Sequence, residues 1–248
     1  MGKLIWSFLT SAAFSLAILL SAQGHAAEVV GVTTDAAKGK KGAVTSPTKA
    51  ASATTASKVA PKTAGALPSV ETAVFAGGCF WCMQPPFDKL KSQGVISTRV
   101  GYAGGTKENP TYEETSAGGT GHREAIEVTY NPQKISYRKL LETFWHNVDP
   151  FDSRGQFCDK AEQYTSAVFY KSNSEKVEYE KSLNEVVKNT AKVKGEVATI
   201  AKPFTNFYPA EDYHQAYYSK NPIRYKYYRN GCGRDARLKE VWGHSDHE

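Results

Sequence analysis

The chain has few cysteines and almost no net charge in the region where a fold is expected. Its 248 residues include only four cysteines and two methionines. No Gly-x-Gly-x-x-Gly sequence occurs, so the dinucleotide-binding fingerprint is absent. Residues 71–248 carry 24 basic and 23 acidic side chains. A nucleic-acid reader would carry its basic excess on the folded domain, so we expect no nucleic-acid partner.

Residues 28–70 lack aromatic side chains altogether. They contain no Phe, Trp or Tyr and consist mostly of Ala, Thr, Lys, Gly, Ser and Val. Such a composition cannot bury enough apolar surface to offset the entropy of an ordered chain. The sequence therefore predicts a disordered, flexible and basic tether. Two uses stay open for it: a solvated spacer, or loose attraction to an anionic membrane or envelope polymer.

The amino terminus combines one positive charge with one apolar run. Lys3 precedes an apolar stretch over residues 4–20, and small residues follow over 21–27. This order is typical of a secretory signal peptide. The run is shorter than the ~20 residues that span a bilayer, which favours cleavage over an uncleaved anchor helix. We expect cleavage after Ala26 or Ala27, a periplasmic location and no stable membrane insertion afterwards.

Residues 71–248 are predicted to form one domain, because strand and helix patterns alternate through them. Apolar or alternating runs predict strands over 72–76, 95–101, 124–130, 166–170 and 197–201. Amphipathic runs predict helices over 136–147, where Ser136 can cap the helix, and over 174–188. Pro85 and Pro86 predict one helical turn over 79–83 and a separate helix over 86–92. After Pro203 we expect an aromatic-rich, irregular segment. The alternation predicts an α/β or α+β layered domain.

The four cysteines do not form a metal-binding pattern. Cys79 and Cys82 make a Cys-x-x-Cys pair, whereas Cys158 and Cys232 are isolated. A structural zinc site would need a second close pair or suitably spaced His, so we expect no metal. A static disulfide framework is the alternative, because an exported protein occupies an oxidising compartment. A domain of this length can build its own core without such links.

The position of Cys79 favours chemistry. It follows Gly77 and Gly78 after a predicted strand, at the start of a helical turn. Free backbone N–H groups at that place favour a thiolate and lower the pKa of a cysteine. Phe80 and Trp81 would form an aromatic wall beside it. An activated thiolate next to an apolar pocket suits attack on a small, apolar electrophile.

Several segments in this region and beyond carry a family resemblance. They are Gly-Cys-Phe-Trp-Cys at 78–82, Gly-Tyr-Ala-Gly-Gly at 101–105, Thr-Gly-His-Arg-Glu-Ala at 120–125, Phe-Trp with Asp-Pro within 144–150, Gln-Phe-Cys-Asp with Gln-Tyr within 156–164, and Phe-Tyr-Pro-Ala-Glu-Asp-Tyr-His-Gln at 207–215. In this order they resemble the peptide methionine sulfoxide reductase A family, which is specific for the S epimer of the sulfoxide. The resemblance covers about residues 74–243. It implies a single two-layer α+β domain with a mixed sheet flanked by helices.

The resemblance also implies roles for matching residues. Cys79 is similar to the nucleophile that attacks the sulfoxide sulfur, and Glu124 matches the acid that protonates the oxygen. The implied substrate-binding residues are Phe80 and Trp81 around the methyl group, and Tyr102, Asp159 and Tyr164 around the oxygen. The substrate is oxidised methionine, free or in exported proteins that the enzyme repairs. A thioredoxin-like dithiol is the implied reductant, with no bound cofactor, and we expect a monomer.

Cys82 departs from the commonest family pattern, in which Gly stands at this position and a carboxy-terminal Cys resolves the intermediate. The short loop to Cys79 favours Cys82 as the resolving thiol. The strict disulfide torsion within one helical turn argues against it, and Cys232 lies between glycines. We predict a relay in which Cys82 resolves first and Cys232 takes over the bond; direct resolution by Cys232 is the alternative. Cys158 is expected to be a buried free thiol, and His214 a structural rather than a catalytic residue.

Two other functions fit part of these observations. One is a thiol–disulfide oxidoreductase that uses Cys79 and Cys82 as a thioredoxin-type pair. The other is an exported binding domain with two inert disulfides. Glu124 and the aromatic pair Phe80 and Trp81 distinguish a sulfoxide reductase from both, because neither alternative needs an acid beside an apolar pocket.

Overall fold

The computed structural model describes residues 69–190 and 195–245. The predicted signal peptide, residues 1–27, lies outside the described residues, and so does the predicted tether, residues 28–70, apart from its last two positions. Among the described residues, no helix has both the length and the apolar character needed to cross a membrane.

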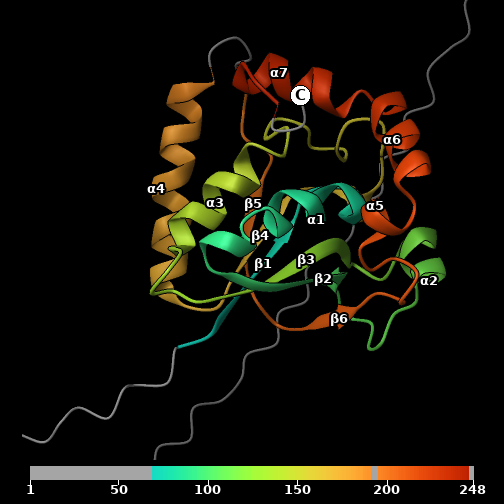
Figure 1. Ribbon diagram of the computed structural model, residues 1–248, viewed down its shortest axis with the longest axis horizontal. Coiled ribbons are helices and arrows are strands. Elements are labelled where there is room, and N and C mark those ends of the chain that lie inside the picture. The colour runs from blue at the N-terminus through green and yellow to red at the C-terminus, as the bar shows by residue number, and fades with distance from the viewer. Residues whose placement is uncertain (1–68, 191–194, 246–248) are drawn as a thin grey trace, which may run out of the picture. The chain divides into compact units, whose positions relative to one another are not determined.

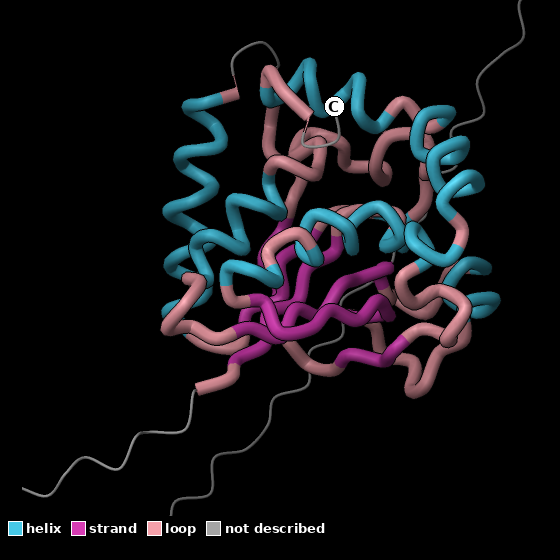
Figure 2. Tube along the Cα trace, in the orientation of Figure 1, coloured by secondary structure: helices cyan, strands magenta, loops and turns pink. Residues whose placement is uncertain are grey.

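A mixed sheet of six strands forms the centre of the described domain (Figures 1 and 2). The strands are β1 (Glu71–Ala76), β2 (Val95–Ala103), β3 (Arg123–Tyr130), β4 (Ala167–Tyr170), β5 (Ile200–Pro203) and β6 (Phe207–Pro209). Their order is β5-β4-β1-β3-β2-β6, and each neighbouring pair is antiparallel except β4 and β5, which run parallel. The predicted α+β class with a mixed sheet is confirmed.

Seven α-helices accompany the sheet within the described residues. They are α1 (Phe80–Asp88), α2 (Tyr112–Ala117), α3 (Tyr137–Trp145), α4 (Asn173–Asn189), α5 (Tyr217–Lys220), α6 (Pro222–Gly231) and α7 (Arg234–Trp242). Serine caps begin two of them: the hydroxyls of Ser136 and Ser172 accept the backbone N–H of the residue three positions on. The predicted helices over 136–147 and 174–188 correspond to α3 and α4.

Helices α1, α3 and α4 cover one face of the sheet (Figure 1). The Phe75 ring on β1 lies 5.4 Å from the ring of Phe87 on α1 and 5.4 Å from that of Phe144 on α3. The indole of Trp145 donates a hydrogen bond to Ser182 on α4, which links the two outer helices at 2.9 Å. This packing holds the end of β1 and the start of α1 in place, and Cys79 and Cys82 lie at that junction.

The predicted end of the first helical turn at residue 83 is wrong, and so is the predicted separate helix over 86–92. Pro85 and Pro86 lie inside α1, which runs without a break from residue 80, and residues 91–93 form only a short 3-10 helix, η1 (Lys91–Gln93). Burial of Phe80, Met83 and Phe87 on α1 compensates for the backbone hydrogen bonds that the prolines remove.

The segment after Pro203 is also regular rather than irregular. It contains β6, α5, α6 and α7. Its many aromatic side chains obscure the helical periodicity, and Pro222 at the first position of α6 marks a helix start that the composition hides.

Candidate active site

Two glycines place Cys79 at the start of α1. A side chain on Gly77 would come within 2.5 Å of Met83 Sδ, and one on Gly78 would come within 2.5 Å of Gln156 Cβ. Gly78 also has φ +78°, a conformation that glycine adopts at little cost. The chain therefore turns tightly from β1 into α1, with Cys79 as the residue before the helix.

Cys79 opens into a pocket of about 240 Å³. The lining residues are Cys79, Phe80, Trp81, Tyr112, Glu124, Asp159, Tyr164 and Tyr228. They come from α1, α2, β3 and α6, from the loop that holds Asp159 and from the 3-10 helix η2 (Glu162–Tyr164). The structure thus brings together six of the residues singled out from the sequence, although they are spread over 86 positions of the chain.

Glu124 is the acid of this pocket. It is only 3% exposed, and its Oε2 accepts the backbone N–H of Phe80 at 3.0 Å. Burial raises the pKa of Glu124 to about 8, with smaller contributions from the charges of Asp159 and Cys82, although the Phe80 N–H opposes the change. The carboxyl is therefore mostly protonated at neutral pH, so it can donate a proton to a ligand in the pocket.

Cys79 and Cys82 are both buried free thiols. Burial raises the pKa of Cys79 well above its ordinary value, and contact with Cys82 and the charge of Glu124 act in the same direction. This result corrects the expected lowering. One N–H at the start of α1, that of Phe80, is already bound to Glu124. The cost of burying a thiolate exceeds the stabilisation that the remaining N–H groups could give it.

The pKa of Cys82 is shifted in the opposite direction. Its hydrogen bond with Cys79 and the positive charges of Arg234 and Arg229 lower its pKa to about 6, although burial opposes this. Both arginines are buried. Arg234 donates to the carbonyls of Gly77 at 3.0 Å and of Asn147 at 2.7 Å, and Arg229 forms an ion pair with Asp235 at 2.5 Å. Sequence reasoning missed these two arginines, because nothing local connects residues 229 and 234 with residue 82.

The family resemblance implies that Tyr102 binds the sulfoxide oxygen, but this residue does not line the pocket. Its hydroxyl donates to Glu211 Oε2 at 2.9 Å, and Glu211 Oε1 accepts the backbone N–H of Tyr112 at 2.9 Å. Tyr102 therefore helps to hold the start of α2, and Tyr112 supplies the tyrosine of the pocket. A signal was present in the sequence: Thr111 and Glu114 form a capping box, which marks a helix beginning at Tyr112.

His214 lies behind the aromatic wall and is not among the lining residues. Its Nδ1 accepts a hydrogen bond from the Trp81 indole at 2.9 Å, and its ring centre is 4.9 Å from that of Phe80. Burial lowers the pKa of the imidazole, which favours the neutral form that can accept from the indole. The structure thus places His214 where it orients Trp81.

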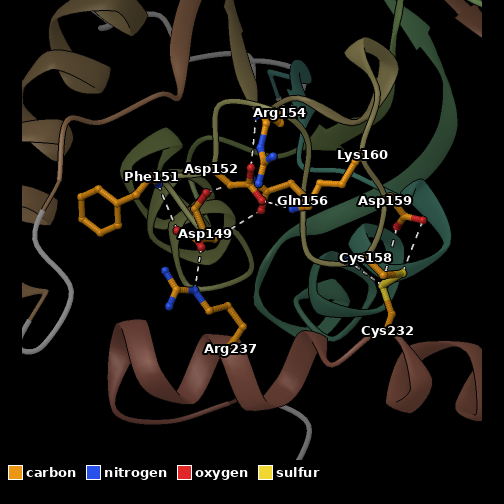
Figure 3. A network of polar contacts seen from close by, with 10 residues as sticks. All are labelled: Asp149, Phe151, Asp152, Arg154, Gln156, Cys158, Asp159, Lys160, Cys232 and Arg237. Atoms are coloured by element: carbon orange, nitrogen blue, oxygen red, sulfur yellow. Dashed lines mark hydrogen bonds and ion pairs between the residues drawn. A yellow bond between two sulfur atoms is a disulfide. The ribbon is translucent and has the colours of Figure 1, made fainter. Parts of the chain in front are cut away.

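Cys158 forms a disulfide with Cys232, so the expectation of a buried free thiol at residue 158 is wrong (Figure 3). Backbone hydrogen bonds between Gln156 and Asp159 close a tight turn that leaves Cys158 exposed. Cys232, the residue that ends α6, lies beside this turn. A pairing of residues 74 positions apart cannot be deduced from one sequence. Because Cys79 and Cys82 are not bonded to each other, the structure also differs from a binding domain with two inert disulfides.

A free thiol that lines a pocket together with a carboxyl, beside a second thiol under the influence of two arginines, fits a thiol-dependent oxidoreductase. Comparisons with known proteins agree with this class. Residues 71–246 match the sequence model of the family described as "Peptide methionine sulfoxide reductase". The chain is 45% identical over 178 residues to peptide methionine sulfoxide reductase MsrA of Bacillus licheniformis, covering 72% of this chain and 97% of that protein. It is 47% identical over 178 residues to MsrA 2 of Caulobacter vibrioides, covering 72% and 88%.

Two solved structures share the fold. Mxr1 from Saccharomyces cerevisiae in reduced form has a TM-score of 0.56 at 33% identity, covering 62% of this chain and 86% of that one. Methionine sulfoxide reductase A of Corynebacterium diphtheriae has a TM-score of 0.56 at 32% identity, covering 63% and 77%. The chain belongs to the peptide methionine sulfoxide reductase A family, the peptide-methionine (S)-S-oxide reductases. The resemblance seen in the sequence is confirmed.

Proposed function

We propose that the protein reduces the S epimer of methionine sulfoxide, free or within proteins, to methionine. The proposal rests on one arrangement above all: the Cys79 thiol and the protonated Glu124 line the same small pocket as Phe80 and Trp81. A sulfoxide needs a nucleophile for its sulfur, a proton for its oxygen and an apolar contact for its methyl group. The pocket offers all three within about 240 Å³.

In the first step Cys79 attacks the sulfoxide sulfur while Glu124 donates its proton to the oxygen. The oxygen passes to Cys79, which becomes a sulfenic acid, and methionine leaves. The Cys79 sulfur loses two electrons and the substrate sulfur gains them; the Cys79 thiol proton restores Glu124. Protonation of the oxygen makes the substrate sulfur electrophilic enough for a cysteine whose pKa is raised in the empty pocket.

Two tyrosines add hydrogen-bond donors for the oxygen. Burial raises the pKa of both Tyr112 and Tyr164, so their hydroxyls keep their protons. With the oxygen held by Glu124 and these phenols, and the methyl group held by Trp81, the sulfur presents one face to Cys79. The other epimer would exchange two of these groups, which accounts for selectivity between the epimers.

We further propose that Cys82 resolves the sulfenic acid. Its pKa of about 6 makes it a thiolate at neutral pH, and it already contacts Cys79. Its attack releases water and forms a Cys79–Cys82 disulfide. An external dithiol, thioredoxin-like in its chemistry, then returns both cysteines to thiols.

The proposed activity predicts reduction of an S-sulfoxide methionine derivative by the purified protein with dithiothreitol as reductant. The same derivative with the R configuration is the control and should give little product. Methionine formation is measured by chromatography. Equal rates with both epimers, or no product from either, would contradict the proposal.

The location of the protein is a separate proposal. Residues 1–27 have the order of a secretory signal, so we propose export to the periplasm, where the enzyme repairs exported proteins and draws on a reductant on that side of the membrane. The mature protein should begin at Ala27 or Glu28. Amino-terminal sequencing of protein from a periplasmic extract tests this, and a chain that starts at Met1 would contradict cleavage.

A further inference from the structure

We propose that His214 is the positioning residue that fixes the Trp81 indole, and that it thereby sets which alkyl groups the pocket accepts beside the sulfoxide sulfur. The inference rests on the proposed function, because Trp81 is the wall that receives the methyl group of the substrate. It assigns a role in substrate specificity to a residue that does not itself line the pocket.

Two tyrosines pack against Trp81 without fixing its orientation. The ring of Tyr217 is stacked on the indole with ring centres 3.7 Å apart, and the ring of Tyr228 meets it edge-on at 5.9 Å. Stacked rings keep much of their contact when one of them slides or turns in its own plane. A hydrogen bond is directional, so the 2.9 Å bond from the Trp81 indole N–H to His214 Nδ1 fixes what stacking does not.

The bond to the indole also defines the protonation state of His214. An indole N–H can only donate, so Nδ1 is the acceptor and the single proton of the neutral imidazole lies on Nε2. Nε2 is buried, has no hydrogen-bond partner among the described residues and lies 4.0 Å from Glu211 Oε2. The Glu211 oxygens are held by the Tyr102 hydroxyl and the Tyr112 N–H. A second proton would have to occupy Nδ1 and would break the bond to the indole.

The segment that carries His214 is anchored on both the sheet and α1. Gln215 Oε1 accepts the backbone N–H of Val100 on β2 at 3.0 Å, and Gln215 Nε2 donates to the Val100 carbonyl at 2.8 Å. The backbone N–H of Ala216 donates to Gln84 Oε1 on α1 at 2.8 Å. The imidazole, itself only 1% exposed, is therefore a fixed point against which the indole can be held.

Protonation of His214 is expected to release Trp81. The charged groups that face the imidazole are Glu211 from its own segment and Glu113 from α2. Both favour the imidazolium, but burial is the larger effect and lowers the pKa below its ordinary value of 6.5. The other neighbours are aromatic rings that carry no charge at neutral pH, namely Phe80, Tyr112 and Tyr213. The indole should therefore be held at neutral pH and released in acid.

Two variants separate the hydrogen bond from the packing of the imidazole. His214→Phe keeps a ring but offers no acceptor to the indole N–H, whereas His214→Asn keeps an acceptor oxygen near the position of Nδ1 but has no ring. Each is assayed with dithiothreitol on the S epimers of methionine sulfoxide and of its S-ethyl homologue, which differ by one methylene. His122→Asn is the control, because His122 is 2% exposed, accepts the Gly105 N–H through Nδ1 and does not line the pocket.

We expect the wild type to prefer the methyl compound by about tenfold or more in kcat/KM, as one methylene can give in a fixed apolar pocket. His214→Phe should reduce this preference by about threefold or more and lower kcat/KM for the methyl compound about three- to tenfold, mainly through KM. His214→Asn and His122→Asn should keep most of the preference. An unchanged preference in folded His214→Phe, with folding checked by thermal unfolding, would overturn the proposal.

The pH dependence of His214→Asn gives a second readout, which packing alone would not change. The ratio of wild-type kcat/KM to that of His214→Asn for the methyl compound cancels the ionisation of groups that both proteins share. This ratio should fall by about threefold or more as the pH decreases from about 7.5 to 5, because only the wild type can protonate Nδ1. Glu124 stays protonated over most of this range, so its loss does not produce the fall.

The possible failures are distinguishable. If the wild type reduces neither sulfoxide, the proposed function fails. If it reduces the methyl compound but the ratio to His214→Asn stays constant with pH, His214 does not hold Trp81 and the inference is wrong while the proposed function stands.

Discussion

Replacing Cys79 with Ser is expected to abolish sulfoxide reduction. Cys79 is the cysteine that lines the pocket together with Glu124, and a serine hydroxyl cannot take up the oxygen as a sulfenic acid. Ser is close to Cys in size, so the residue before α1 should keep its place and the pocket should still bind substrate. Methionine release with dithiothreitol, followed over many times the wild-type half-time, measures the loss.

Cys82→Ser is the matched control for that variant. It removes the other buried free thiol, on the first turn of α1, which touches Cys79 but does not line the pocket. It should still release one equivalent of methionine in a first turnover, because resolution comes after product formation. Substantial turnover by Cys79→Ser, or loss of the first turnover in Cys82→Ser alone, would mean that the nucleophile is misassigned.

Glu124→Gln should lower the rate of reduction by a factor on the order of 10²–10⁴, the contribution credited to a positioned general acid. The amide oxygen of Gln can still accept the Phe80 N–H, but the amide has no acidic proton to give. We expect kcat to fall far more than KM changes. Glu127→Gln is the control on the same strand, because Glu127 forms an ion pair with Arg99 and does not line the pocket; its kinetics should stay near those of the wild type.

The dependence of kcat/KM on pH distinguishes loss of the general acid in Glu124→Gln from a general disruption of the fold. Glu124 is active when protonated, and its pKa is about 8, so wild-type kcat/KM should fall as the pH rises through about 8. The Gln variant should lack this fall. A near-normal rate in Glu124→Gln would show that another group supplies the proton. The same conclusion would follow if kcat/KM of this variant still fell as the pH rises through about 8.

The same raised pKa affects the free energy of unfolding. The folded state keeps the Glu124 proton up to about pH 8, whereas the unfolded chain loses it near the ordinary value of 4.5. The folded state therefore binds more protons between these limits, and this group makes the protein less stable as the pH rises from about 4.5 to 8. Glu124→Gln removes that contribution, so its stability relative to wild type should increase over the same range.

The pKa shifts of the two active-site thiols have opposite directions, and this bears on how each thiol meets oxidants. Oxidation by small oxidants follows thiolate character and exposure. Cys79 is only 5% exposed and its raised pKa keeps it as a thiol, which limits reaction before a sulfoxide binds. The pKa of Cys82 is lowered to about 6, but this thiol is buried and does not line the pocket, so burial limits its access to small oxidants.

Local sequence patterns determined much of this protein. Alternating or apolar runs predicted β1, β2, β3 and β4, and a serine cap predicted α3, because strand alternation and helix capping depend on residues within a few positions. The Gly77-Gly78 turn pointed to Cys79 for the same reason. The family motifs pointed to Glu124, Asp159 and Tyr164, and the structure brings them to one pocket with Cys79.

The tertiary structure alone decided the features that depend on distant neighbours. Tyr112 rather than Tyr102 lines the pocket, because Glu211 holds the start of α2 from 99 positions away. The link between Cys158 and Cys232 depends on how α6 ends against a loop 74 positions earlier. The pKa of Cys79 is raised rather than lowered, because burial is a property of the packed domain. Sequence spacing shows which groups can act, but contacts across the fold decide their protonation and their partners.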